Sequence, residues 1–271
     1  MRNCLFIAVL ALLPFLAFAK KDNSISVKSV DITFQQVSGS YYMSQEITNG
    51  QYLAFLIDLA NKGRVAEAAR LVPDSTQWVA ELAYNEPMVQ HYFRHPAYSG
   101  YPVVNITKEG AEAYCAWLTE QVRREEKLNL PNATCSLPTE AEWITASAPF
   151  MENPYPWYGP YAYNEQGEML CNVKVKRVDN NAFLQYQGIG SVALTTPPQS
   201  YYPNRYGLYN VIGNVAEITS EGYIKGGSWG NTFDECDVTK RQDYTLPSAH
   251  VGFRVMLKKE PVAVSYHKGG S

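Results

Sequence analysis

Three segments of the chain place apolar residues three and four positions apart, which is the spacing of one face of a helix. Two of them open with a capping box, in which a threonine and a residue three positions further on exchange side-chain and backbone hydrogen bonds. Gly63 follows the first segment and marks the end of its helix, because glycine readily takes the left-handed conformation found after helices. The predicted helices cover about Asn49 to Lys62, Thr107 to Val122 and Thr139 to Ala148.

Strands are predicted at four short runs rich in β-branched and aromatic residues: Ser26 to Phe34, Tyr101 to Asn105, Tyr223 to Lys225 and Gly252 to Leu257. Long loops separate these runs. The chain has 20 Tyr and 5 Trp with 16 Pro and 18 Gly, so we expect the loops to pack through aromatic rings. The pattern predicts an α+β fold with low regular secondary structure.

The first 19 residues have the pattern of a secretory signal peptide. Arg2 supplies the positive charge, an apolar stretch runs from Leu5 to Phe18, and Ala19 ends a small-x-small cleavage site. Cys4 precedes the apolar stretch, whereas a lipoprotein cysteine would follow it. We expect a signal peptide at 1–19, a folded domain at 20–258 and a flexible tail at 259–271. The mature protein is then periplasmic or secreted, without a transmembrane segment.

The charge of the chain argues against one class of partner. The formal net charge is -3 at pH 7, and Lys and Arg are scattered rather than grouped into a stripe. Nucleic-acid binding depends on a basic face, so we expect no nucleic-acid partner.

The segment from Asn204 to Trp229 carries oxygen donors at a spacing that suits one hard cation. Asn210 and Glu217 offer side-chain oxygens, and the carbonyls of Gly213 and Val215 between them can converge on the same calcium ion. A turn closed by its own hydrogen bonds, with Asn210 as a cap and Glu217 in a salt bridge, fits the same spacing. Both interpretations stay open on the residues alone.

Six motifs follow one another in the order of a known family. The chain resembles the formylglycine-generating enzyme (sulfatase-modifying factor) family along nearly all of the predicted domain. The resemblance implies a single α+β domain related to C-type lectins, poor in regular structure and stabilised by calcium. The motifs are YYMSQEITNGQYLAF, HPAYSGYPVVNITKEGAEAYCAWL, CSLPTEAEW, NRYGLYNVIGNVAEITS, KGGSWG and VGFRV.

Enzymes of this family oxidise a cysteine of an unfolded sulfatase, using oxygen and a copper(I) ion held between two cysteine thiolates. The resemblance puts Asn231 at the first copper cysteine, Cys236 at the second and Ser228 at the active-site serine. An amide oxygen is a poor ligand for copper(I), which prefers sulfur. Ala216 also stands where the family's GNxWEW sequence has tryptophan. These departures predict that copper is not a cofactor.

The resemblance also assigns two calcium sites. One matches position by position at Asn210, Gly213, Val215 and Glu217. Only the start of the other matches, at Asn172 and Val173; its aspartate is not evident near Gly190 and could be replaced by Asp179.

Residues Pro73 to Val104 resemble the gliding-motility and type IX secretion lipoproteins of Bacteroidetes, which share the fold without the oxidase chemistry. This chain lacks their lipobox cysteine. We expect an exported, non-catalytic domain acting in envelope assembly, gliding motility or type IX secretion, with envelope or secretion-system proteins as partners. The alternative is a copper-dependent oxidase acting on a protein cysteine through Cys236 and Ser228.

The family's peptide cleft is the expected partner site. It would lie beside Ser228 and Cys236 and hold an extended peptide segment by aromatic packing. The alternative is a filled cleft whose aromatic rings belong to the core. The residues expected to line it are Trp229, Asn231, Phe233 and Tyr244.

Four cysteines follow the predicted signal peptide, so an exported chain can form two disulfides in any of three pairings. The resemblance places the family's partner of Cys115 at Val255, so that bridge cannot form here. Other pairings and buried free thiols both stay open for Cys115, Cys135, Cys171 and Cys236.

Overall fold

The structure is a computed structural model that describes residues 24–80, 86–147, 153–174 and 194–259. The predicted signal peptide, the predicted tail beyond Lys259, and both Asp179 and Gly190 lie outside the described residues. Among the described residues no helix is long and apolar enough to cross a membrane.

Two small sheets carry the fold. The first is antiparallel with the strand order β1-β2-β3-β9-β4, and the second has the order β7-β6-β5-β8 with a parallel β5–β8 pair. The first sheet comprises β1 (Ser24–Val27), β2 (Ile32–Ser38), β3 (Tyr41–Ser44), β9 (Met256–Lys258) and β4 (Thr134–Ser136). The second comprises β7 (Gln242–Asp243), β6 (Tyr223–Lys225), β5 (Ala216–Ile218) and β8 (Val251–Gly252).

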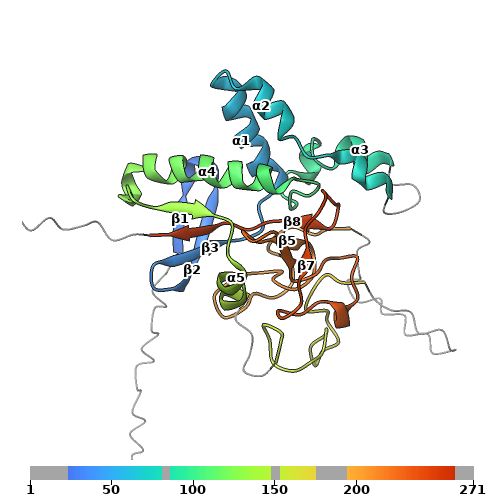
Figure 1. The fold of residues 1–271 in the computed structure, drawn as a ribbon. Coiled ribbons are helices and arrows are strands. Elements are labelled where there is room, and N and C mark those ends of the chain that lie inside the picture. Colours follow the sequence, from blue (N-terminus) through green and yellow to red (C-terminus); the bar gives the residue numbers. More distant parts are fainter. Residues whose placement is uncertain (1–23, 81–85, 148–152, 175–193, 260–271) are drawn as a thin grey trace, which may run out of the picture.

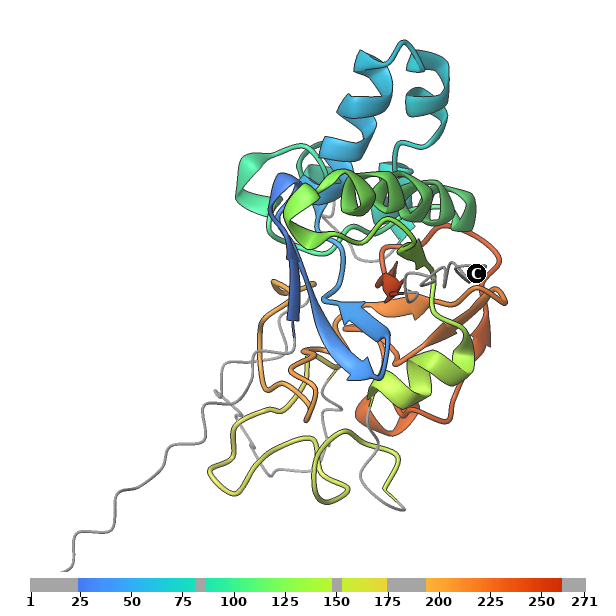
Figure 2. The same cartoon turned by 90° about the vertical axis from the view of Figure 1, so that its left-hand side faces the viewer.

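Four of the helices, α1 to α4, gather at one end of the molecule, and α5 lies at the opposite side of the sheets (Figure 1; Figure 2). The α-helices are α1 (Asn49–Asn61), α2 (Val65–Arg70), α3 (Glu86–His91), α4 (Lys108–Arg124) and α5 (Glu140–Ser147). Short 3-10 turns are η1 (Lys28–Val30), η2 (Ser75–Ala80), η3 (Pro96–Tyr98), η4 (Glu126–Leu128) and η5 (Phe233–Glu235). The predicted α+β class with sparse regular structure is confirmed.

All three predicted helices form where their local signals place them. Thr48 Oγ1 accepts from the Gln51 amide at 3.2 Å, and Gln51 Oε1 accepts from the Thr48 amide at 3.0 Å. Thr139 and Glu142 make the same exchange at the start of α5. The apolar faces of α1 and α4 meet in the main core, where Tyr52 stacks on Tyr114 at 5.8 Å between ring centroids.

Three of the four strand predictions need correction. The run Tyr101 to Asn105 forms no strand; its only β contact is an isolated bridge at Pro102. The run Ser26 to Phe34 is broken by η1, because Asp31 takes a left-handed conformation at φ 51° that turns the chain into a hairpin. Only Tyr223 to Lys225 coincides with a strand.

The third correction matters most for the site. The run Gly252 to Leu257 is not one strand, since Gly252 ends β8 in the second sheet and Met256 begins β9 in the first. Phe253, Arg254 and Val255 cross between the sheets and are fully buried. This crossover puts the Arg254 side chain into the interior of the domain.

Candidate functional site

A cavity of about 310 Å³, which we call the Ser228 pocket, opens beside the second sheet. Its wall is formed by the glycine turn after β6, by Ser228 and Asn231, and by the loop that runs from Lys240 to Val251. Tyr244, Leu246 and His250 also line it. The sequence-predicted residues Ser228, Asn231 and Tyr244 are thus brought together at one cavity.

Hydrogen bonds fix the base of the Ser228 pocket. Asn231 Oδ1 accepts from the Ser228 hydroxyl at 2.8 Å and from the Ser228 amide at 3.0 Å. The Asn231 main chain bonds back to Ser228 at 3.0 Å and to Lys174 at 2.7 Å. His250 Nδ1 lies 3.3 Å from the Ser228 hydroxyl oxygen. Asn231, which the resemblance puts at the family's first copper cysteine, therefore closes the turn that holds Ser228.

The remaining cysteine of the expected copper pair is inaccessible. Cys236 is fully buried, and burial raises the pKa of its thiol to about 12. A Cβ placed on Gly227, whose φ is +70°, would lie 2.2 Å from Cys236 Sγ, so glycine at this position allows the thiol to pack directly under the turn. A buried thiol with a raised pKa is a poor nucleophile.

Two of the predicted partner-binding aromatics lie outside the lining of the pocket. Trp229 is 7% exposed and lies between Trp78 and His250, with centroids 6.4 Å and 4.2 Å away. Phe233 stacks on Tyr155 at 4.5 Å. The buried Trp229 ring fits the alternative in which the cleft residues belong to the core, whereas Phe233 is half-buried. Tyr244 is half-buried, lines the pocket and donates its hydroxyl to the Ile106 carbonyl.

The segments proposed for calcium lie side by side. The Asn214 amide donates to the Asn172 carbonyl at 2.8 Å. A Cβ on Gly213, whose φ is +78°, would lie only 2.4 Å from that same carbonyl oxygen and 2.9 Å from a Val173 methyl group. Gly213 is therefore required for the two segments to approach so closely. Val215 is buried beside them.

The donor atoms fit a calcium ion in part. Asn172 Oδ1 and Asn210 Oδ1 are both buried, and neither has a hydrogen-bond partner within the described ranges. Buried amide oxygens without a donor are free to bind a cation. Glu217 differs, because its two oxygens accept from Arg254 Nε at 2.6 Å and Trp143 Nε1 at 2.7 Å. Glu217 therefore forms a salt bridge, as expected if this segment is a turn closed by its own hydrogen bonds. A calcium ion bound here would share the Glu217 carboxylate with Arg254.

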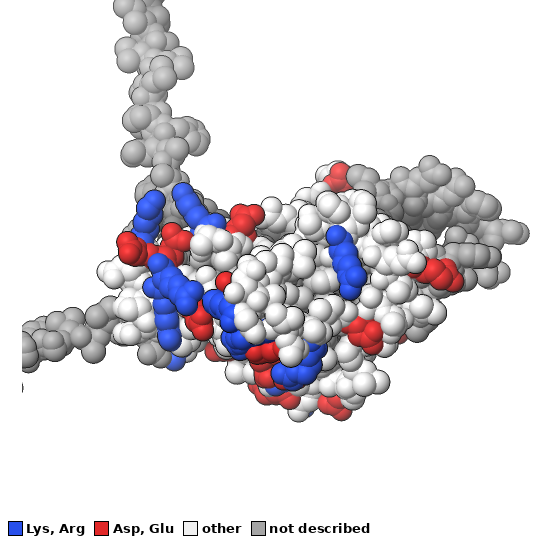
Figure 3. Space-filling model, turned by 90° about the horizontal axis from the view of Figure 1, so that it is seen from above, with Lys and Arg blue, Asp and Glu red and all other residues white. Residues whose placement is uncertain are grey.

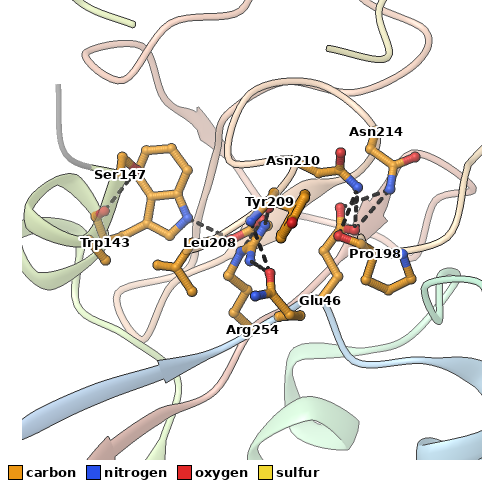
Figure 4. A network of polar contacts seen from close by, with 12 residues as sticks. Glu46, Trp143, Ser147, Pro198, Leu208, Tyr209, Asn210, Asn214 and Arg254 are labelled. Carbon is orange, nitrogen blue, oxygen red and sulfur yellow. Dashed lines mark hydrogen bonds and ion pairs between the residues drawn. The ribbon is translucent and has the colours of Figure 1, made fainter. Parts of the chain in front are cut away.

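Sequence reasoning missed the centre of this region, a buried polar network built around Glu46 and Arg254 (Figure 4). Glu46, 2% exposed, accepts from Asn210 Nδ2 at 3.1 Å and from Asn214 Nδ2 at 2.9 Å. Arg254 donates to the carbonyls of Ser44 and Tyr209 as well as to Glu217. The available signal in the sequence was one acidic residue, Glu46, two positions after the end of β3.

The network holds two buried carboxylates against one guanidinium, so it is short of positive charge. Burial raises the pKa of Glu46 to about 8, opposed by Arg254 and reinforced by the neighbouring Glu217 carboxylate. Burial also raises the pKa of Glu217, and Arg254 opposes that shift. Across the described part of the chain, no group of three or more His, Cys, Asp and Glu side chains is arranged to hold a metal ion.

The face of the molecule seen from above gives no sign of nucleic-acid binding (Figure 3). Basic and acidic side chains lie interspersed on the face seen in Figure 3. Ion pairs such as Lys62–Asp58 and Lys108–Glu112 join them on the helices. A face with mixed charges lacks the continuous positive patch that binding to a phosphate backbone requires.

Comparison with known proteins identifies the family. The sulfatase-modifying factor enzyme 1-like domain matches residues 28–259. The inactive C-alpha-formylglycine-generating enzyme 2 of Bos taurus is 30% identical over 205 residues, covering 66% of this chain and 60% of its own length. The formylglycine-generating enzyme of Mus musculus is 29% identical over 178 residues, 62% of this chain and 42% of its own length.

The fold is also similar to that of a solved structure. PvdO from Pseudomonas aeruginosa superposes with a TM-score of 0.52 over 89% of this chain and 100% of its own, at 16% sequence identity. At this identity the likeness shows the fold alone. The match along nearly the whole described domain shows that the chain belongs to the sulfatase-modifying factor enzyme 1-like (formylglycine-generating enzyme) domain family.

Proposed function

We propose that this protein is an exported, non-catalytic member of its family that holds an extended segment of a partner protein in the Ser228 pocket. The observation that carries the proposal is the arrangement of the two residues at the expected copper site. Asn231 is engaged in holding Ser228, and the Cys236 thiol is fully buried with a raised pKa. No thiolate is therefore presented to the pocket by these two residues.

Two further observations agree with a binding role. The inactive formylglycine-generating enzyme 2 is among the similar proteins, although this chain spans only 60% of its length. The mouth of the pocket offers an apolar contact, because Leu246 is 73% exposed there. An exposed leucine beside a half-buried tyrosine suits an apolar side chain of a bound segment.

The setting that we propose is the cell envelope, in gliding motility or type IX secretion. This assignment rests on the resemblance of Pro73 to Val104 to lipoproteins of those systems. The partner is then an envelope or secretion-system protein, and the mature chain is periplasmic or secreted. Envelope proteins are therefore the sample in which to look for the partner.

One preparation with two readouts tests the proposal. Supplied with copper(I), oxygen, a reductant and a CxPxR peptide, the protein should form no aldehyde. Immobilised and incubated with envelope proteins, it should capture a partner, and Leu246→Asp should lower that capture at least about tenfold. The matched control is Val79→Asp, since Val79 is 60% exposed and lies outside the pocket lining. Aldehyde formation that disappears in Cys236→Ser would establish the oxidase instead.

We propose calcium as a structural ligand at Asn210, with the carbonyls of Gly213 and Val215. Support comes from the unpartnered Asn210 Oδ1. A ligand that binds only the folded state stabilises it by about 2.7 kcal/mol at a hundredfold excess over its dissociation constant. Calcium should therefore raise the Tm of the chelator-treated protein, and Asn210→Ala should abolish that rise.

The control for calcium is a second buried asparagine. Asn204 uses its side chain on the Ala146 and Ser147 carbonyls and on the amides of Tyr206 and Leu208, so Asn204→Ala should lower Tm yet keep the calcium-dependent rise. Glu217 is unsuitable for this purpose, because its loss leaves Arg254 without its carboxylate whether or not calcium binds. An identical Tm in calcium and chelator would rule the site out.

A further inference from the structure

Two of the four cysteines of the described chain come together where α4 packs on β4. The Thr119 hydroxyl bonds to the Cys115 carbonyl at 3.0 Å and also accepts from the Cys135 amide at 2.9 Å. The main chains of both cysteines thus meet at one side-chain oxygen. Both side chains are buried in the same main core cluster. A disulfide needs Cα atoms about 4.4–6.8 Å apart, which main chains this close can provide.

The other two cysteines share a second, much smaller cluster. Cys171 and Cys236 are buried there with Trp143, Tyr155, Val173, Ile212 and Val238. The chain after Cys171 runs beside the chain before Cys236, because Lys174 and Thr232 form a parallel bridge and Lys174 donates to the Asn231 carbonyl at 2.7 Å. Burial is the main cause of the raised pKa of their cluster neighbour Tyr155, and Asp237 and both thiols add to it. The two side chains are therefore placed within one small apolar core.

Each cluster contains one of these two pairs of cysteines and no cysteine of the other pair. All four cysteines are buried free thiols in this structure. We propose that the oxidised protein contains two disulfides, Cys115 with Cys135 and Cys171 with Cys236. Of the three pairings that four cysteines allow, this is the one in which each bridge stays within a single cluster. Either of the others would have to join residues from separate cores.

Each bridge forms by ordinary thiol–disulfide exchange. Two Sγ–H groups give one Sγ–Sγ bond, and the two electrons and two protons go to a disulfide oxidant such as oxidised glutathione, which becomes two thiols. Burial raises the pKa of Cys135 to about 12 and that of Cys171 further still. Because the thiolate is the attacking species, the bridges should form during folding, before the thiols are buried.

The second bridge has a consequence for the Ser228 pocket. It would use the last thiol at the expected copper position and tie the segment that carries Asn172 to the pocket wall. The first bridge would join α4 to the first sheet in a place where the family's own bridge cannot form. Both bridges would lower the conformational entropy of the unfolded chain and so stabilise the folded protein.

Peptide mapping tests the pairing directly. The reduced, unfolded full chain carrying Cys4→Ser, so that only these four cysteines remain, is refolded in a glutathione buffer, so that burial does not limit access of the oxidant, and free thiols are then alkylated. Trypsin alone is insufficient, because residues 128–174 contain no Lys or Arg before Lys174 and keep Cys135 and Cys171 on one peptide. A second cleavage after glutamate separates them. The expected result is two cross-linked peptides and a mass lower by about 2 Da per bridge.

Variants with two cysteines removed give the control. Cys115→Ala/Cys135→Ala should retain the Cys171–Cys236 bridge, and Cys171→Ala/Cys236→Ala should retain the other. Cys115→Ala/Cys236→Ala leaves one cysteine in each cluster and should keep both thiols free. A bridge between Cys135 and Cys171 in that variant, any other pairing in the parent, or four alkylated thiols after refolding would overturn the proposal.

Discussion

Replacing Arg254 with methionine should lower the free energy of unfolding by about 3–5 kcal/mol, because it leaves the Glu217 carboxylate buried without its cation. Arg254 is fully buried and donates to Glu217 at 2.6 Å. Glu46 lies in the same network and also depends on this guanidinium. Domains of this size are stable by only about 5–15 kcal/mol, so the variant should show a large fall in Tm and in the urea midpoint.

A surface arginine provides the matched control. Arg241 pairs with Glu140, but half of its side chain is exposed, and Arg241→Met should leave the Tm and the urea midpoint nearly unchanged. The double variant Arg254→Met/Glu217→Gln should regain part of the loss, since glutamine can still accept from Trp143 without a charge. Equal, small effects at Arg254 and Arg241 would show that the buried pair contributes little.

Glu46 should make the protein less stable as the pH rises from about 5 to 8. Its pKa in the folded protein is raised from 4.5 to about 8 by burial, so folding favours the protonated form. That contribution is complete below the pKa of the unfolded chain and is lost as the pH passes through the folded pKa. A difference of this size corresponds to a change on the order of 4 kcal/mol in unfolding free energy.

Glu46→Gln should remove most of this dependence, because an amide of the same shape carries no proton to lose. The measurement is urea unfolding at several pH values between 5 and 8 for the parent and the variant. The exposed Glu112→Gln serves as the control and should leave the slope unchanged. Asp58, Asp74 and Asp237 have lowered pKa values, so their contributions are lost at more acid pH. A flat profile in the parent would contradict the predicted burial of an uncompensated Glu46.

The sequence predicted the helices well because their signals are local. A capping box joins residues three positions apart, and the apolar faces of α1 and α4 follow from a spacing of three and four. The turn at Ser228 is also local, since its glycines and Asn231 lie within a few residues of one another. The sequence likewise provided the family motifs.

The strands and the roles of single side chains depended on contacts that no local pattern records. Gly252 to Leu257 has the composition of one strand, yet its two ends pair with different sheets. Trp229 and Phe233 follow the glycine turn in the sequence, where residues that line the cleft were expected. In the tertiary structure Trp229 packs against Trp78 and Phe233 stacks on Tyr155.

The sequence by itself therefore determined the α+β class, the three longer helices and the family, because each is recorded in residue identity or short-range spacing. Only the tertiary structure decided that Glu217 pairs with Arg254, that Glu46 is buried beside Asn210 and Asn214, and which cysteines share a core. Those residues are far apart in the chain. Their contacts arise from how the two sheets pack, and the energy of a buried charge depends on what surrounds it rather than on its neighbours in sequence.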